Sequence, residues 1–197
     1  MADFVIDYID AGWPGSNPKD AEFFQLARGE SWHDRLVAFG STRRKGTFAS
    51  EDPQVQALVE SGVPTVCIVA KAHLGQVTEI LRASPEENLE MISDTVMFLC
   101  SKGIQVMVDL EHFFDGFYLD KEYTLKCGIV ATEAGASCIV LCDTNGGSMP
   151  WSIGEATKFV TDHFTENQVT IGIHCHNDCG MAVANSLSGC QNGVGLI

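Results

Sequence analysis

Two histidines two residues apart follow a short run of strand-type residues at 170–173. Side chains alternate between the two faces of a strand, so His174 and His176 are expected on the same face. Two imidazoles on one face can bind a divalent metal ion together. Cys175, which lies between them, is expected on the opposite face and is not interpreted as a ligand. The alternative is a pair of half-exposed histidines at a strand end.

Acidic and hydroxyl side chains end two other apolar segments. Asp109 and Glu111 lie two residues apart, so they share one face of their strand. Asp143 and Thr144 end another segment. Acids and histidines that meet at one edge of a sheet fit a metal site with a general base. Each group alone could be a plain turn or a solvated strand end, but their recurrence after successive strands favours a shared site.

Alternating strands and helices would bring these residues to one edge. Strands are expected at 4–11, 36–40, 65–70, 104–110, 138–141, 170–173 and 194–197, and helices at 19–28, 53–61, 85–101, 123–134, 151–164 and 182–191. The repeat of roughly 30 residues is that of a βα unit. The strands are mostly continuous apolar runs, as in parallel sheets covered on both faces.

Two fold classes share this alternation, a doubly wound sheet and a (β/α)₈ barrel. The number of strands favours the barrel, and no Gly-x-Gly-x-x-Gly follows the first strand to support a dinucleotide-binding sheet. In a barrel, the polar loops after the strands carry the active site.

Composition limits the classes of partner. The 197 residues include 12 Lys and Arg against 26 Asp and Glu, a formal net charge of -14. This charge argues against nucleic acid or an anionic membrane as the main partner. No apolar run approaches the roughly 18–20 residues of a membrane span. The acidic N-terminus does not resemble a signal peptide, and the eight cysteines suit reduced, buried thiols. A cytoplasmic protein is expected, with an organelle as the alternative for a longer precursor.

Several motifs together resemble the 2-isopropylmalate and homocitrate synthase family, and within it the citramalate branch. They are GWPGSNPKD at 12–20, AFGSTRR at 38–44, EHFFDG at 111–116, DTNGG at 143–147, HCHND at 174–178 and GMAVANS at 180–186. The resemblance covers almost the whole chain. It implies a metal-dependent (β/α)₈ TIM barrel.

The resemblance also implies a reaction, the Claisen condensation of acetyl-CoA with a 2-oxo acid. In the citramalate branch that acid is pyruvate and the products are (R)-citramalate and CoA. A divalent metal ion (Zn²⁺, Mn²⁺, Co²⁺ or Mg²⁺) holds the keto acid and polarises its carbonyl. The implied partners are these small molecules and, in the full-length form, a second copy in a homodimer.

Site residues follow from the motifs. His174 and His176 correspond to two metal ligands. Glu111 corresponds to the catalytic carboxylate, and Thr144 to the residue that hydrogen-bonds the keto-acid carboxylate. Further candidates for substrate binding are Asp109, Asn145 and Arg43.

Two parts of the family pattern are not found in this sequence. The family's first strand ends in Asp-x-x-x-Arg-Asp, which supplies a metal-binding Asp and a catalytic Arg. Its last strand leads into a Gly-x-Gly-Glu-Arg-x-Gly-Asn loop with an Asn ligand. Residues 1–197 are therefore expected to form a single partial catalytic domain. The expected barrel lacks its first strand and the end of its eighth unit, and the C-terminal regulatory domain of the family is expected to be absent from these residues. Such a fragment is expected to have little activity alone and to aggregate through unpaired strands.

Two other functions stay open. One is a different reaction of the same superfamily, that of 2-isopropylmalate synthase, homocitrate synthase or an acyl-CoA lyase. The other is a catalytically inactive βα fragment that acts as a binding or assembly module and completes another chain's barrel.

Overall fold

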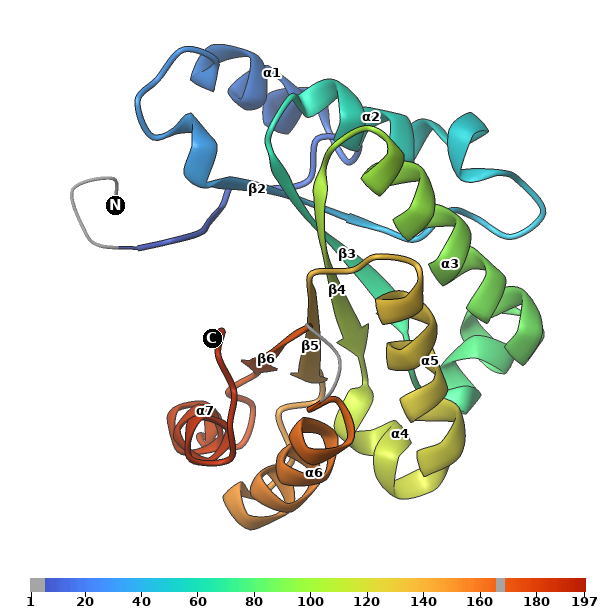
Figure 1. The fold of residues 1–197 in the computed structure, drawn as a ribbon, viewed down its shortest axis with the longest axis vertical. Coiled ribbons are helices and arrows are strands. Elements are labelled where there is room, and N and C mark those ends of the chain that lie inside the picture. The colour runs from blue at the N-terminus through green and yellow to red at the C-terminus, as the bar shows by residue number, and fades with distance from the viewer. Residues whose placement is uncertain (1–5, 166–168) are drawn as a thin grey trace.

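Within the described residues, six parallel strands form one sheet, and they lie side by side in chain order. The computed structural model describes residues 6–165 and 169–197. The strands are β1 Ile9–Asp10, β2 Leu36–Ser41, β3 Thr65–Lys71, β4 Gln105–Glu111, β5 Cys138–Asp143 and β6 Thr170–Cys175. Figure 1 shows helices in an arc along the outer side of this curved sheet. The expected incomplete (β/α)₈ barrel is confirmed.

Helices follow the strands along the chain. They are α1 Pro18–Ala27, α2 Pro53–Ser61, α3 Pro85–Ser101, α4 Phe113–Leu119, α5 Lys121–Glu133, α6 Pro150–His163 and α7 Ala182–Gln191, with short helical turns η1 His33–Arg35, η2 Ala49–Glu51 and η3 Gln76–Leu81. The expected bounds of α2, α3 and α7 are confirmed. No helix in the described part of the chain is long and apolar enough to cross a membrane.

Three elements differ from expectation. The strand expected at 4–11 is reduced to Ile9–Asp10, and part of it lies outside the described residues. The strand expected at 194–197 is a single bridge between Gly172 and Leu196. Helix α4 was not expected, because Gly116 interrupts its seven residues. A Cβ on Gly116 would lie 2.8 Å from the carbonyl oxygen of Ala72, so close packing requires glycine there.

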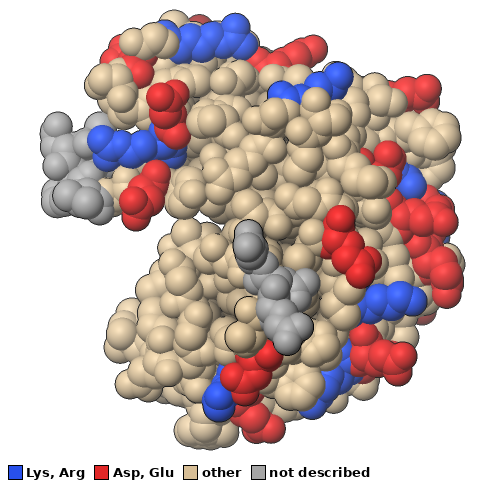
Figure 2. Space-filling model, in the orientation of Figure 1, with Lys and Arg blue, Asp and Glu red and all other residues tan. Residues whose placement is uncertain are grey.

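The main core lies between the sheet and its helices. Its largest fully buried side chains include Phe24, Leu58, Ile92, Phe113 and Ile139. A smaller cluster of Met107, Cys138 and Val140 covers part of the inner face of the sheet. On the face drawn in Figure 2, acidic side chains are spread over the surface rather than gathered in one patch.

Asp52 joins the loop after β2 to the start of α2. Its side chain is fully buried and accepts hydrogen bonds from the backbone N–H groups of Gln54 and Arg44, both at 2.8 Å. Burial raises the pKa of the Asp52 carboxyl. These backbone bonds and the Arg44 guanidinium outweigh burial, so the pKa lies below its ordinary value.

We expect Asp52→Ala to lower the free energy of unfolding by about 2 kcal/mol, since it removes a helix cap and leaves buried donors unpaired. A carboxyl whose folded pKa is depressed stabilises above the unfolded pKa, and the effect is lost as pH falls through the folded pKa. The difference from wild type should therefore shrink below about pH 4. Urea unfolding at several pH values measures it. The exposed neighbour Glu51 provides the control, because Glu51→Ala should change stability by less than about 0.5 kcal/mol.

Candidate metal and substrate site

A cavity of about 520 Å³ lies at the carboxyl ends of the strands. It is lined by Trp13, Phe39, Ser41, Val69, Lys71, Asp109, Glu111, Cys142, Thr144, His174 and His176. We call it the metal-site cavity. Five of the seven site residues expected from the sequence line it, contributed by β4, β5, β6 and the residues just after them. The strands thus bring together side chains that lie far apart in the sequence.

The two histidines face the same cavity. Their ring centroids are 4.8 Å apart. Cys142 lies beside His174 in the register of β5 and β6, and its Sγ is within 4.8 Å of the ligand atoms of both histidines. Cys142 was missed from the sequence, although it stands two residues before Thr144 and so shares its face. Cys175 packs against the hydrophobic core, as the alternation predicts.

Asp109 contacts the first histidine directly. Its Oδ2 is 3.2 Å from Nδ1 of His174, and its side chain is almost fully buried on β4. The hydrogen bond to Asp109 raises the pKa of His174, although burial acts in the opposite direction. The buried carboxylate therefore favours a proton on the imidazole.

Glu111 forms an ion pair with Lys71. The two residues are in register at the ends of β4 and β3, and both side chains are about one-fifth exposed (24% and 19%). Lys71 was also missed from the sequence. The sequence pattern that could have indicated it is a single lysine at the end of an otherwise apolar strand. The pair places a carboxylate and an ammonium group side by side on the cavity wall.

Thr144 is held by a strained residue. Its Oγ1 accepts a 2.7 Å hydrogen bond from the backbone N–H of His112 and donates to Sγ of Cys142 at 3.2 Å. His112 has a φ of 58°, in the left-handed region that non-glycine residues rarely adopt. The unusual backbone directs the His112 N–H at the threonine and fixes its side chain at the cavity.

Asn145 and Arg43 lie outside the metal-site cavity. The Asn145 amide donates to Asp115 at 2.7 Å. Arg43 turns towards α3, with Nε 2.8 Å from Asp94 and Nη1 3.2 Å from Glu87. Both residues follow the end of a strand, where alternation no longer sets the direction of the side chain. The structure does not bring these two to the histidines.

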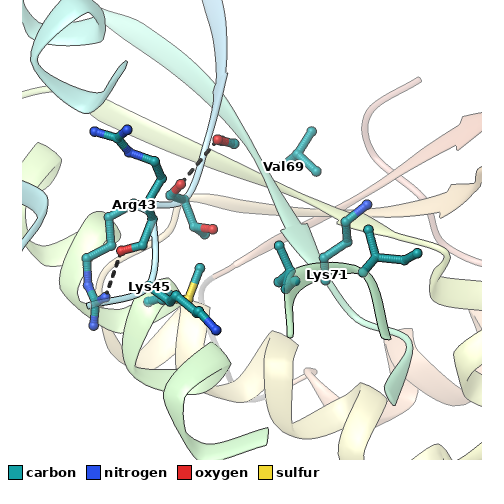
Figure 3. A pocket seen from close by; sticks show the side chains of 10 residues that line it. Arg43, Lys45, Val69 and Lys71 are labelled. Atoms are coloured by element: carbon teal, nitrogen blue, oxygen red, sulfur yellow. Dashed lines mark hydrogen bonds between the residues drawn. The ribbon is translucent and has the colours of Figure 1, made fainter. Parts of the chain in front are cut away.

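Arg43 lines a second cavity, of about 290 Å³, together with Arg44 and Lys45. Figure 3 shows Lys71 and Val69 on β3 across this cavity from Arg43 and Lys45. Val69 and Lys71 also line the metal-site cavity, so the two cavities share a wall.

Comparison with known proteins gives consistent matches. Residues 1–197 match the HMGL-like family. The (R)-citramalate synthase of Streptomyces coelicolor is 47% identical over 98% of this chain and 36% of that protein. That of Sulfolobus acidocaldarius is 44% identical over 96% of this chain and 36% of that protein. The 2-isopropylmalate synthase of Staphylococcus carnosus is 29% identical over 96% of this chain and 36% of that protein.

Among solved structures, the HMG-CoA lyase of Bacillus subtilis superposes with a TM-score of 0.75 at 19% identity, covering 97% of this chain and 63% of that one. At this identity the likeness shows the fold alone. The chain spans about a third of the length of the curated relatives it matches, 36% for the first two. From the match over residues 1–197, the chain belongs to the HMGL-like family.

Proposed function

We propose that this chain is part of a citramalate synthase, which condenses acetyl-CoA with pyruvate to give (R)-citramalate and CoA. The observation that carries the proposal is the metal-site cavity, where two imidazoles, a carboxylate and a hydroxyl group meet. The choice of 2-oxo acid is supported by the relatives. Five citramalate synthases are 42–47% identical to the chain, whereas the 2-isopropylmalate synthases are 26–29% identical.

The donor set fits a divalent metal ion. His174, His176 and Cys142 place their ligand atoms within 4.8 Å of one another, and a buried carboxylate stands behind His174. Imidazole nitrogen with oxygen or sulfur donors suits Zn²⁺ or Co²⁺, and Mn²⁺ when the other donors are oxygens. When bound, the ion would act as a Lewis acid on the keto-acid carbonyl.

The chain's own residues supply the base and the binding groups. Glu111 takes a proton from the methyl group of the acetyl thioester. The resulting carbanion equivalent forms a C–C bond to the ketone carbon of pyruvate, while the C=O π bond opens and the ketone oxygen takes up a proton to become the tertiary hydroxyl group. Water then hydrolyses the citramalyl thioester and releases CoA. Lys71 has three N–H donors, so those not used by Glu111 can bind the pyruvate carboxylate beside Thr144. Arg43 pairs with acidic residues of α3 and Asn145 with Asp115 of α4, rather than with pyruvate.

The test uses the full-length protein, because the chain spans about a third of its relatives. Free-thiol release is measured with acetyl-CoA and pyruvate, 2-oxoisovalerate or 2-oxoglutarate. We expect the highest kcat/KM with pyruvate. A preference for 2-oxoisovalerate would identify a 2-isopropylmalate synthase, and one for 2-oxoglutarate a homocitrate synthase. Release with none of the three overturns the proposed reaction.

We also propose that residues 1–197 form the larger part of one catalytic domain that acts as a homodimer in the cytoplasm. Exposed apolar side chains on neighbouring helices support a subunit contact, among them Tyr118 on α4, Trp151 on α6 and Val183 on α7. All eight cysteines are free thiols, which suits a reducing compartment. Light scattering on the full-length protein tests the dimer.

A further inference from the structure

Asp109 is a carboxylate buried among apolar neighbours on the inner side of the sheet. Its side chain is only 4% exposed, and its register neighbours Val69 and Val140 are apolar. A buried charge is strongly destabilising unless it is paired. Oδ2 is 3.2 Å from His174, whereas Oδ1 has no hydrogen-bond partner among the described residues.

The other groups beside Asp109 are thiols, and that of Cys142 is close enough to hydrogen-bond the carboxylate. Cys67, Cys138 and Cys142 lie close enough to feel its charge. Burial raises the pKa of each of these thiols, and the Asp109 carboxylate raises it further. Neutral thiols cannot balance a carboxylate, so His174 is the basic group within the described residues that contacts it. Binding the 2-oxo acid is a poor alternative role, because two carboxylates repel each other.

We infer that Asp109 is a positioning residue, which accepts the Nδ1–H of His174 and leaves Nε2 of that ring free for a metal ion. A neutral imidazole carries its proton on one nitrogen, and the hydrogen bond made there decides which nitrogen can bind a metal. Outer carboxylates of this kind fix the orientation of the ring and increase its basicity as a ligand. This inference rests on the metal site proposed above.

The first experiment titrates the full-length protein with Co²⁺ and follows visible absorption. His174→Ala defines the background from cysteines, of which residues 1–197 contain eight. Asp109→Leu is expected to raise the Kd for Co²⁺ by about 10–100-fold, the usual effect of losing such a carboxylate. Asp109→Asn should raise it less than about tenfold, because the amide oxygen accepts the same N–H. The spectrum of the Asp109→Leu complex should also change, since the ring is no longer held in one orientation.

The matched control is Asp143→Asn. Asp143 is a carboxylate of similar burial on the adjacent strand, but it accepts from Ser148 at 2.9 Å and Asn185 at 3.3 Å rather than from a histidine. We expect this change to lower stability and to leave the Kd for Co²⁺ unchanged. The control separates loss of a buried charge from loss of the histidine contact.

A second measurement does not need metal. Nitrogen-15 NMR of the metal-free wild-type chain should show His174 with its proton on Nδ1, and Asp109→Leu should shift the ring towards Nε2–H. A wild-type ring protonated only on Nε2, or equal Kd values in wild type and Asp109→Leu, would overturn the role of Asp109 alone. If wild type and His174→Ala take up Co²⁺ alike, the metal site and this role both fail.

Discussion

Replacing Glu111 by glutamine in the full-length protein is expected to lower kcat for pyruvate-dependent CoA release by about 10²–10⁴-fold, the usual contribution of a positioned general base. Glutamine keeps the size of the side chain but cannot take the methyl proton of the acetyl thioester. KM for pyruvate should change little, because the histidines and Thr144 stay in place. Initial rates over a range of pyruvate concentrations measure both constants.

The same motif offers a control carboxylate. Asp115 lies four residues after Glu111, but it contacts Asn145 and the ring of His112 outside the metal-site cavity. Asp115→Asn should therefore leave kcat near that of wild type. Retention of more than about a tenth of wild-type kcat by Glu111→Gln would show that another group is the base. Unchanged Co²⁺ affinity in both variants would confirm that the loss lies in proton transfer.

Much of the site could be predicted because strand alternation is a local rule. His174 and His176 share a face, as do Asp109 and Glu111, and the structure places all four at one cavity. Helix bounds were predictable for a similar reason. α2 and α3 each begin with proline directly after a capping side chain, a signal confined to a few residues.

The rest depends on contacts that are distant in sequence. Arg43 stands two residues beyond the end of β2, and its direction is set by Glu87 and Asp94 on α3, more than forty residues away. Lys71 is recognised as a site residue by its ion pair with Glu111, and Cys142 by its position beside the two histidines. No local sequence pattern indicates these long-range contacts. For Lys71 and Cys142, strand alternation gives the face but not the partner, and for Arg43, which lies beyond its strand, the sequence gives neither.

The sheet is open at both edges, so some properties of the protein have to be measured on the full-length form. β1 contains two residues. At the other edge of the sheet, within the described residues, β6 pairs with Leu196 through a single bridge from Gly172. The curated relatives are nearly three times longer. The tautomer of His174 depends on residues that are all present here, whereas metal binding and CoA release are properties of the full-length protein. Experiments on the site therefore divide naturally between the two forms.

Removing one of the two imidazoles should have the second large effect. We expect His176→Ala to raise the Kd of the full-length protein for Co²⁺ by at least about 100-fold, more than loss of an outer carboxylate, because a ligand itself is lost. His163→Ala is the matched control, since this imidazole is exposed on α6 and stacks on Phe159 far from the cavity. Its Kd should equal that of wild type. If His176→Ala binds Co²⁺ as tightly as His163→Ala does, the two rings 4.8 Å apart are not a shared metal site. In that case the carboxylate behind His174 has a purely structural role.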